Sequence, residues 1–204
     1  HAGSNGQLES VDVAKINRNF KVKKIRNVKC DVAAIGWGFT PDTTLAGALG
    51  CKQIVAKDNS VVVAVDENQL SSVTGVFADV EVSKAHRKRR AKRQRFANAL
   101  IKSYPIKDGW KSWVHTDTII CRCEEVKLAD LNYAVDELGA TDSRTAKLFT
   151  RCGMGMCQGR ICGRSVVDLV AEHLNVSPTD TDRISSVNRP IITPISLGQL
   201  AAGE

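Results

Sequence analysis

Five of the seven cysteines in this 204-residue chain lie in two short pieces of sequence. The first piece is Cys121-Arg122-Cys123, and the second contains Cys152, Cys157 and Cys162. Cysteines grouped this tightly either bind a metal or form disulfides, so they constrain the fold more than any other feature of the chain. The question is which of these uses the sequence favours.

Three uses are open: disulfides, a zinc ion and a [2Fe–2S] cluster. Disulfides are disfavoured because the number of cysteines is odd and no secretory leader is recognisable, so we expect a reducing compartment. Structural zinc sites usually pair cysteines as C-x(2–4)-C, whereas the first pair here is C-x-C. Iron–sulfur clusters accept four thiolates at more varied spacings. The spacing therefore favours a [2Fe–2S] cluster, with zinc as the alternative.

Glycines accompany the second group of cysteines, at positions 153, 155, 159 and 163. A glycine lets the backbone come close to a bulky cofactor and point its N–H groups at the sulfur atoms. Such hydrogen bonds lower the cost of burying a negatively charged cluster. The glycines therefore agree with a cluster-binding loop.

These motifs carry a resemblance to a known family. Cys-Arg-Cys-Glu-Glu (121–125) and Thr-Arg-Cys-Gly-Met-Gly-Met-Cys-Gln-Gly-Arg-Ile-Cys (150–162) resemble the bacterioferritin-associated-ferredoxin-like [2Fe–2S] module. More closely, they resemble the version fused to an FAD/NAD(P)-type flavoprotein, found in the A (alpha) subunit of opine oxidases, the B subunit of hydrogen cyanide synthase and dye-linked proline dehydrogenases. The resemblance implies four ligands, Cys121, Cys123, Cys157 and Cys162. We expect Cys152 to be a small buried residue rather than a fifth ligand.

The N-terminal part of the chain reads as pieces of an α/β domain. Alternating apolar residues at 11–16 and 22–25 predict two short strands joined near Asn17. The apolar run 32–35 predicts a parallel strand, and Gly36 and Gly38 follow it as candidate dinucleotide- or flavin-binding residues. A short helix is expected over 43–50, capped by Asp42 and ended by Gly50.

The same region resembles the flavoprotein family at a set of scattered positions: Gly36, Gly38, Pro41, Thr44, Leu45, Ala46, Gly50 and Cys51. The resemblance also implies that Cys51 is a core residue. The match breaks after Ala78, where the family's last FAD-contacting motif would follow, and Asp79 is a doubtful flavin ligand. The pyrophosphate-binding Gly-x-Gly-x-x-Gly is also absent. We expect that the sequence omits segments before His1 and near residue 78, and that the complete protein binds FAD.

A basic run separates this region from the cysteines. Residues Lys84–Arg95 hold eight of the 29 Lys and Arg residues and no acid. The remaining 21 basic residues nearly balance 22 acidic ones, so the pI of about 9.1 comes from this one segment. We predict a solvated helix that links two domains, continues through Phe96, Leu100 and Ile101, and ends at Tyr104-Pro105.

Around the cysteines the apolar spacing predicts three helices. The first covers Leu128 to Leu138 and stops at Gly139, the second runs from a Ser143 cap to Leu148, and the third starts within 159–163 and reaches Leu174. Cys157 and Cys162 are thereby expected at or just inside a helix N-terminus, whose partial positive charge stabilises thiolates. We expect His173 to be a surface or packing residue.

Together these observations predict an α/β chain: an incomplete two-dinucleotide-binding-domain flavoprotein piece and a small, mainly helical [2Fe–2S] domain. The expected parts are a partial FAD/NAD(P)-binding-like domain (1–78), a basic helical linker (79–116), the [2Fe–2S] domain (117–175) and an extended docking tail (176–204).

The resemblance implies an oxidoreductase function. The chain would be the electron-transfer subunit of a flavin-dependent dehydrogenase or oxidase that acts on an amino acid or secondary amine of the opine, proline or glycine type. It would use a [2Fe–2S] cluster and FAD, and pair with a substrate-oxidising flavoprotein subunit in a hetero-oligomer. We expect it in the cytoplasm, free or at the inner face of the membrane.

Two other classes of function stay open. One is a stand-alone ferredoxin-like electron carrier. The other is a zinc-stabilised module that binds nucleic acid through Lys84–Arg95. The second is disfavoured because aromatic residues make up only 5% of the chain and no known DNA-binding spacing is present. No nucleic-acid partner is therefore expected.

Overall fold

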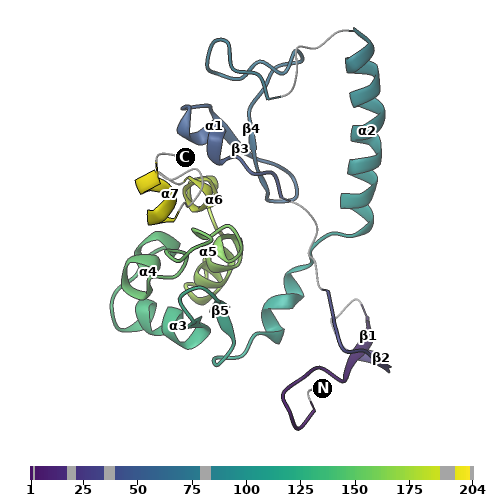
Figure 1. The fold of residues 1–204 in the computed structure, drawn as a ribbon, viewed down its shortest axis with the longest axis vertical. Coiled ribbons are helices and arrows are strands. Elements are labelled where there is room, and N and C mark those ends of the chain that lie inside the picture. Colours follow the sequence, from purple (N-terminus) through teal and green to yellow (C-terminus); the bar gives the residue numbers. More distant parts are fainter. Residues whose placement is uncertain (2, 18–21, 35–39, 79–83, 189–195, 203–204) are drawn as a thin grey trace. The chain divides into compact units, whose positions relative to one another are not determined.

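The computed structural model describes residues 1, 3–17, 22–34, 40–78, 84–188 and 196–202. The chain falls into two compact units, residues 1–39 and residues 40–204. Over the described residues, all strand pairing is antiparallel and two-stranded. The strands, several of them labelled in Figure 1, are β1 (Ser10–Ile16), β2 (Val22–Lys29), β3 (Gln53–Val55), β4 (Val61–Val63), β5 (Ile119–Cys121) and β6 (Val126–Lys127).

The first unit is built on the β1–β2 ladder. Ser10 pairs with Lys29 at one end, and the register shifts between Lys15 and Ile16. The Asn27 side chain donates hydrogen bonds across the ladder to Ser10 (3.0 Å) and to Asp12 (2.8 Å). The alternating apolar residues thus form the two predicted strands, and residues 18–21 lie outside the described part of the chain.

The prediction of a parallel strand over 32–35 is wrong for residues 32–34, the part of it that the structure describes. Residues 32–34 belong to no strand, and Val32 is 77% exposed. An apolar run becomes a buried parallel strand only when neighbouring strands cover it, and the described residues supply only antiparallel pairs. The candidate residues Gly36 and Gly38 lie outside the described residues.

The second unit opens with a short helix and a hairpin. Helix α1 (Thr44–Ala48) begins where the Asp42 carboxylate accepts hydrogen bonds from the backbone (2.9 Å) and hydroxyl (2.6 Å) of Thr44. Gly50 ends this turn at φ +77°, which favours glycine. Cys51 is 6% exposed and its thiol contacts Ser71 Oγ (3.4 Å), as expected of a core residue. Strands β3 and β4 follow as an antiparallel pair.

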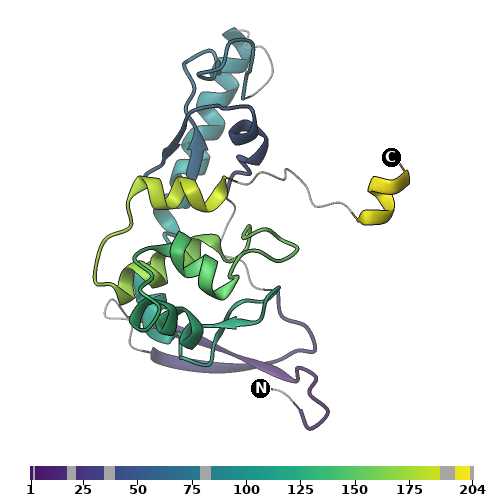
Figure 2. The ribbon, with the colours of Figure 1, turned by 90° about the vertical axis from the view of Figure 1, so that its left-hand side faces the viewer.

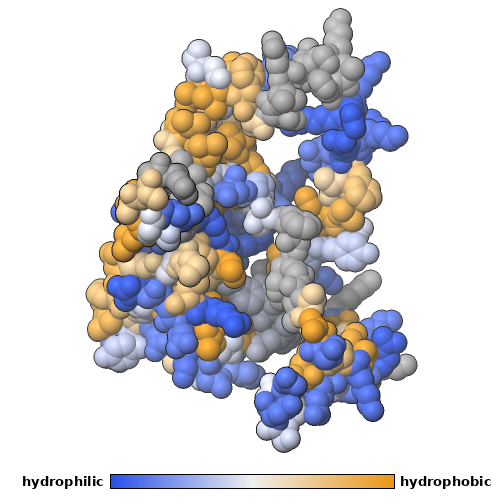
Figure 3. All heavy atoms as spheres, viewed as in Figure 1, coloured by the Kyte–Doolittle hydropathy of each residue, from blue (hydrophilic) through white to orange (hydrophobic). Residues whose placement is uncertain are grey.

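Helix α2 (Lys84–Ser103) carries the basic run and ends just before Tyr104-Pro105, as predicted. From residue 88 to its end, every side chain except Ala97 is exposed. The predicted apolar residues Phe96, Leu100 and Ile101 are 67%, 44% and 44% exposed. Figure 3 shows hydrophilic side chains along one part of this helix and a hydrophobic group further along it. The helix is therefore solvated along most of its described length.

The cysteine-bearing part of the second unit is mainly helical. A small buried core contains residues of β5, β6 and the helices that follow them, and it includes three of the cysteines. Its residues are Cys121, Val126, Leu131, Ala134, Ala140, Ala146, Cys152, Cys162, Val166 and Val170. Figure 2 shows these helices from a second side. The elements are the 3₁₀ helix η1 (Asp108–Trp113), α3 (Leu128–Asp136), α4 (Ser143–Thr150), α5 (Gly163–His173), α6 (Asp180–Val187) and α7 (Leu197–Ala202).

Ion pairs tie the helices together. Arg183 of α6 donates to Asp168 of α5 (2.9 Å), and both side chains are at least 85% buried. His173 of α5 forms an exposed hydrogen bond with Asp136 of α3 (2.8 Å), in agreement with the expected surface or packing residue. The predicted stop of α3 is also found, because Gly139 lies at φ +74°. No helix of the described residues is long and apolar enough to cross a membrane.

Helix α4 begins one residue earlier than expected. Asp142, rather than Ser143, is the N-cap: its carboxylate accepts the Thr145 backbone N–H (2.7 Å), and the Thr145 hydroxyl accepts the Asp142 N–H (3.1 Å). A carboxylate supplies a stronger acceptor than a hydroxyl next to the partial positive charge of a helix N-terminus, which explains the choice.

We predict that Leu131→Ala lowers the free energy of unfolding by about 2–5 kcal/mol, because it leaves a cavity in the core. Leu131 is 1% exposed, whereas Leu148 is 64% exposed and supplies the control substitution Leu148→Ala. The measurement is chemical denaturation followed by circular dichroism at equal metal content. Equal destabilisation by the two substitutions would contradict the core assignment.

The Asp142 cap predicts a pH dependence. The Thr145 backbone hydrogen bond holds the pKa of Asp142 below its usual 3.8. A lowered folded-state pKa stabilises the fold above the unfolded value, and the gain disappears as the pH falls through the folded value. Asp142→Ala should therefore cost about 1 kcal/mol at pH 7 and progressively less below about pH 4. Asp142→Asn, which keeps an acceptor, should cost less; a pH-independent deficit would contradict this account.

Candidate metal centre

The cysteines reach one place from three segments. Cys121 ends β5 and Cys123 lies in the turn towards β6, while Cys152 lies two residues after the end of α4. Cys157 and Cys162 lie in the loop between α4 and α5, with Cys162 at the N-cap position of α5. Cys162 thus lies where a helix N-terminus was predicted, and Cys157 precedes the helix by several residues.

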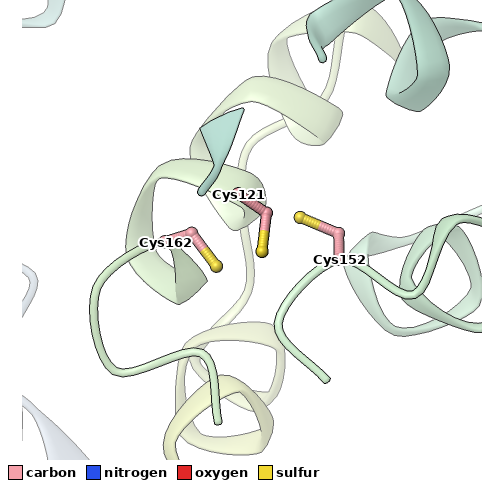
Figure 4. Close-up of side chains that lie close together, drawn as sticks. All are labelled: Cys121, Cys152 and Cys162. Carbon is pink, nitrogen blue, oxygen red and sulfur yellow. The ribbon is translucent and has the colours of Figure 1, made fainter. Parts of the chain in front are cut away.

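Three of the thiols form a buried group. The Sγ atoms of Cys121, Cys152 and Cys162 all lie within 4.8 Å of one another. The three residues are 1%, 2% and 4% exposed. Figure 4 shows the three sulfur atoms pointing towards one another. The backbone N–H of Gly153 donates to the Cys121 sulfur (3.4 Å). That Cys152 joins this group was not predicted from the sequence.

The other two thiols form a more exposed pair beside it. Cys123 is exposed and Cys157 is partly buried. The backbone of Cys157 donates a hydrogen bond to Cys123, which lowers the pKa of that thiol. Three other effects raise the pKa of Cys123: a hydrogen bond with the Cys157 thiol, desolvation, and repulsion from the Cys157 and Cys121 sulfurs. Together they outweigh the backbone hydrogen bond, so the pKa of Cys123 is raised overall. The close approach of Gly155, two residues before Cys157, to the Cys123 side chain shows that the loop of Cys157 packs against the C-x-C turn.

The buried group disfavours free thiolates. The hydrogen bond with Cys162, burial, and repulsion from Cys162 and Cys121 raise the pKa of Cys152. A bare arrangement of this kind keeps its protons, and a metal ion would displace them because it needs thiolate ligands. The site is therefore suited to a cation that neutralises several sulfurs.

The arrangement fits a cysteine-bound metal group. Two thiolates on one tetrahedral metal lie about 3.8 Å apart when each metal–sulfur distance is about 2.3 Å. The buried sulfurs meet this requirement with small shifts, since none is more than 4.8 Å from another. The structure brings the four predicted ligands, Cys121, Cys123, Cys157 and Cys162, to one region and adds a fifth thiol. Which four bind remains a prediction.

Two of the glycines are required for close approach. A Cβ on Gly155 would overlap the Cβ of Cys123, so only glycine lets the loop pass the C-x-C turn. Gly153 lies at φ +80°, and a Cβ there would lie 3.4 Å from the Gly159 Cα. The predicted approach of a glycine backbone to the sulfurs is therefore seen at Gly153, and Gly155 brings the loop against the C-x-C turn.

Cationic groups surround the loop. Arg151 pairs with Glu124 (2.9 Å), which joins the loop to the C-x-C turn, and Arg160 donates to the carbonyl of Cys157 (3.3 Å). Helix α5 has no side-chain cap and no acidic residue in its first turn. Its N-terminal N–H groups therefore add partial positive charge beside Cys162.

A pocket of about 370 Å³ opens beside the buried thiols. Cys152 and Cys162 line it, as do Arg144 and Lys147 of α4. No sequence pattern pointed to these two basic residues, because their place beside the metal site follows from how α4 packs on α5. The pocket connects the buried sulfurs with solvent on a positively charged side.

The geometry defines a class of protein: a small helical domain that gathers cysteines for an iron–sulfur cluster. Residues 119–172 match the family of the BFD-like [2Fe-2S] binding domain. The chain therefore contains a domain of this family, as the cysteine motifs indicated.

Longer relatives extend the similarity beyond this domain. The A subunit of opine oxidase from Rhizobium meliloti is 34% identical over 134 residues, which cover 65% of this chain and 24% of the relative. The HcnB subunit of hydrogen cyanide synthase from Pseudomonas aeruginosa is 27% identical over 199 residues, covering 79% and 42%. Both relatives are named as enzyme subunits, one of an oxidase and one of a synthase.

A solved structure shares the fold. The L-proline dehydrogenase from P. horikoshii superposes with a TM-score of 0.58 at 20% identity, covering 98% of this chain and 43% of that one. The expected fold class, α/β with a small [2Fe–2S] domain, is therefore confirmed. The chain spans less than half the length of each of these three proteins.

We predict that Gly155→Ala reduces the metal content of the protein by about twofold or more, because the added methyl group forces the loop away from Cys123. The control is Gly198→Ala in α7, where a Cβ would meet only Ser196 Oγ at 3.8 Å. Iron and zinc per chain are measured by mass spectrometry of the purified variants. Unchanged metal content in Gly155→Ala would show that the close approach is not needed.

Proposed function

We propose that this chain is part of the electron-transfer subunit of a multi-subunit flavin-dependent dehydrogenase or oxidase. Its substrate would be an amino acid or secondary amine of the opine, proline or glycine type. The substrate-oxidising flavin would lie in a partner subunit, and the complete form of this chain would bind FAD.

The observation that carries the proposal is the convergence of the thiols within a BFD-like domain. A [2Fe–2S] cluster held there would supply one-electron transfer. The four predicted ligands would hold this cluster, with Cys121 and Cys162 at its buried end and Cys123 and Cys157 at its exposed end. The relatives, one from an opine oxidase and one from a hydrogen cyanide synthase, support the class of reaction.

The exposed end suits exchange with a partner. Met156, which precedes Cys157, is 83% exposed, and Ile161 on the same loop is 81% exposed. Exposed apolar side chains beside a charged rim are typical of the centre of a protein interface. Arg151 on the same loop is largely exposed and pairs with Glu124, so the rim carries charges of both signs. A partner would therefore reach the cysteine pair through this surface, where the path for an electron is shortest.

The first test is metal analysis of the protein purified without exposure to air. We expect two irons and two sulfides per chain and a paramagnetic resonance signal that appears on reduction with dithionite. Zinc without iron would overturn the proposal. Salt-dependent DNA binding by such a zinc form, lost when the basic residues of α2 are neutralised, would favour the nucleic-acid module instead.

The second test uses the complete complex. Addition of an opine, proline or glycine should produce the same resonance signal without dithionite, because electrons then arrive from the oxidised substrate. An iron-containing protein that isolates without a partner or flavin, and whose signal no substrate induces, would instead be a stand-alone carrier.

A further inference from the structure

The metal centre has one thiol more than a [2Fe–2S] cluster uses. Such a cluster accepts four thiolates, two on each iron, because the bridging sulfides fill the other positions. Five cysteine thiols converge here, and three of them share the buried end. One buried sulfur is therefore left without an iron position. This inference rests on the proposed function, since it concerns the same cluster.

We propose that Cys152 is a reserve ligand of the cluster, able to take the place of Cys121 or Cys162 but not of Cys123 or Cys157. In the intact protein the four ligands that the resemblance implies would hold the cluster, with Cys121 and Cys162 at its buried end. Cys152 lies beside them as a thiol and binds only when one of the two is lost.

The distances support exchange at the buried end. Two ligands of one iron need a sulfur–sulfur distance of about 3.8 Å. Each pair among Cys121, Cys152 and Cys162 lies within 4.8 Å already, so any two of the three reach that spacing by a small side-chain movement. Among the described residues, the thiols of Cys123 and Cys157 are not part of this close group. Cys152 would need a shift of the backbone to replace either of them.

The loop also holds Cys152 in place. The chain leaves α4 through Arg151 at φ 63°, and Gly153 follows at φ +80°. The Thr150 hydroxyl accepts the Cys152 backbone N–H (3.2 Å). These constraints direct the side chain into the core, where it is 2% exposed. A thiol so placed cannot turn away into solvent when a neighbouring ligand is removed.

The chemistry of the exchange balances without an oxidant or reductant. The Cys152 S–H bond breaks, an S–Fe bond forms in the position of the missing sulfur, and the proton passes to water. The 370 Å³ pocket that Cys152 lines gives solvent a route to this thiol.

The test compares alanine variants in the full chain, because alanine supplies no ligand. Cys162→Ala should keep most of its iron, whereas Cys152→Ala/Cys162→Ala should hold about fivefold less or lower, since only three ligands remain. The matched control is Cys51→Ala/Cys162→Ala, which removes another buried thiol instead. Cys157→Ala should lose iron even though Cys152 is present. Cys121→Ala, with and without Cys152→Ala, repeats the comparison if Cys162→Ala does not fold.

The measurements are iron and sulfide per chain, the resonance signal after reduction, and circular dichroism to show that each variant is folded. The retained cluster in Cys162→Ala should show a shifted signal, because a different sulfur binds the iron. Equal iron loss in folded Cys162→Ala and Cys152→Ala/Cys162→Ala overturns the reserve role. Loss of iron in Cys152→Ala alone also overturns it, since Cys152 would then be an obligatory ligand. An unsubstituted protein without iron would instead contradict the proposed function itself.

Discussion

The structure of the helical domain depends on the burial of three sulfur atoms within a few ångströms of one another. Thiols are weak hydrogen-bonding groups, and several buried thiolates would repel one another strongly at short range. Such a group is stable with its protons or with a metal, and only the metal gives it a function. The surrounding elements serve this arrangement: β5 and α4 each deliver a cysteine, and Cys162 stands at the start of α5.

The two ends of the cysteine group differ in their surroundings. Helices α3, α4 and α5 enclose Cys121, Cys152 and Cys162, so the buried end is fixed by packing. Cys123 and Cys157 lie nearer the surface, next to apolar side chains that nothing in the described chain covers. Rigidity on one side and access on the other are the properties that an electron-transfer site needs, because its geometry must change little while a partner approaches.

Local patterns predicted local structure well. The charge run indicated α2, the apolar spacing indicated α3 and α5, and Gly139 marked the end of α3, because each depends on neighbours within a few residues. The strand expected over 32–35 failed, since a parallel strand needs partners that are remote in sequence. The choice of Asp142 over Ser143 as the cap depends on the strength of two adjacent acceptors, which a pattern search does not rank.

Within the site, sequence reasoning found the cysteines but not their grouping. Spacing and resemblance named four ligands and left Cys152, which lies in the same motif, as a small buried residue. The left-handed turn at Arg151 and Gly153 aims Cys152 at its two neighbours, and only the folded chain shows this direction. Arg144 and Lys147 were missed for a related reason, as they reach the site by packing between helices.

The start of α5 carries one more consequence. Helices α4 and α6 each begin with a capping box, and at the start of α3 the Asp130 carboxylate accepts the Lys127 backbone N–H. The N-cap residue of α5, Cys162, supplies no side-chain cap. The first turn of α5 therefore relies on the loop that precedes it, and a metal bound by Cys162 would fix that loop. Metal-binding energy becomes folding energy at this point. Iron supply would then govern how long the protein survives proteolysis in the cell, as well as whether it can transfer electrons.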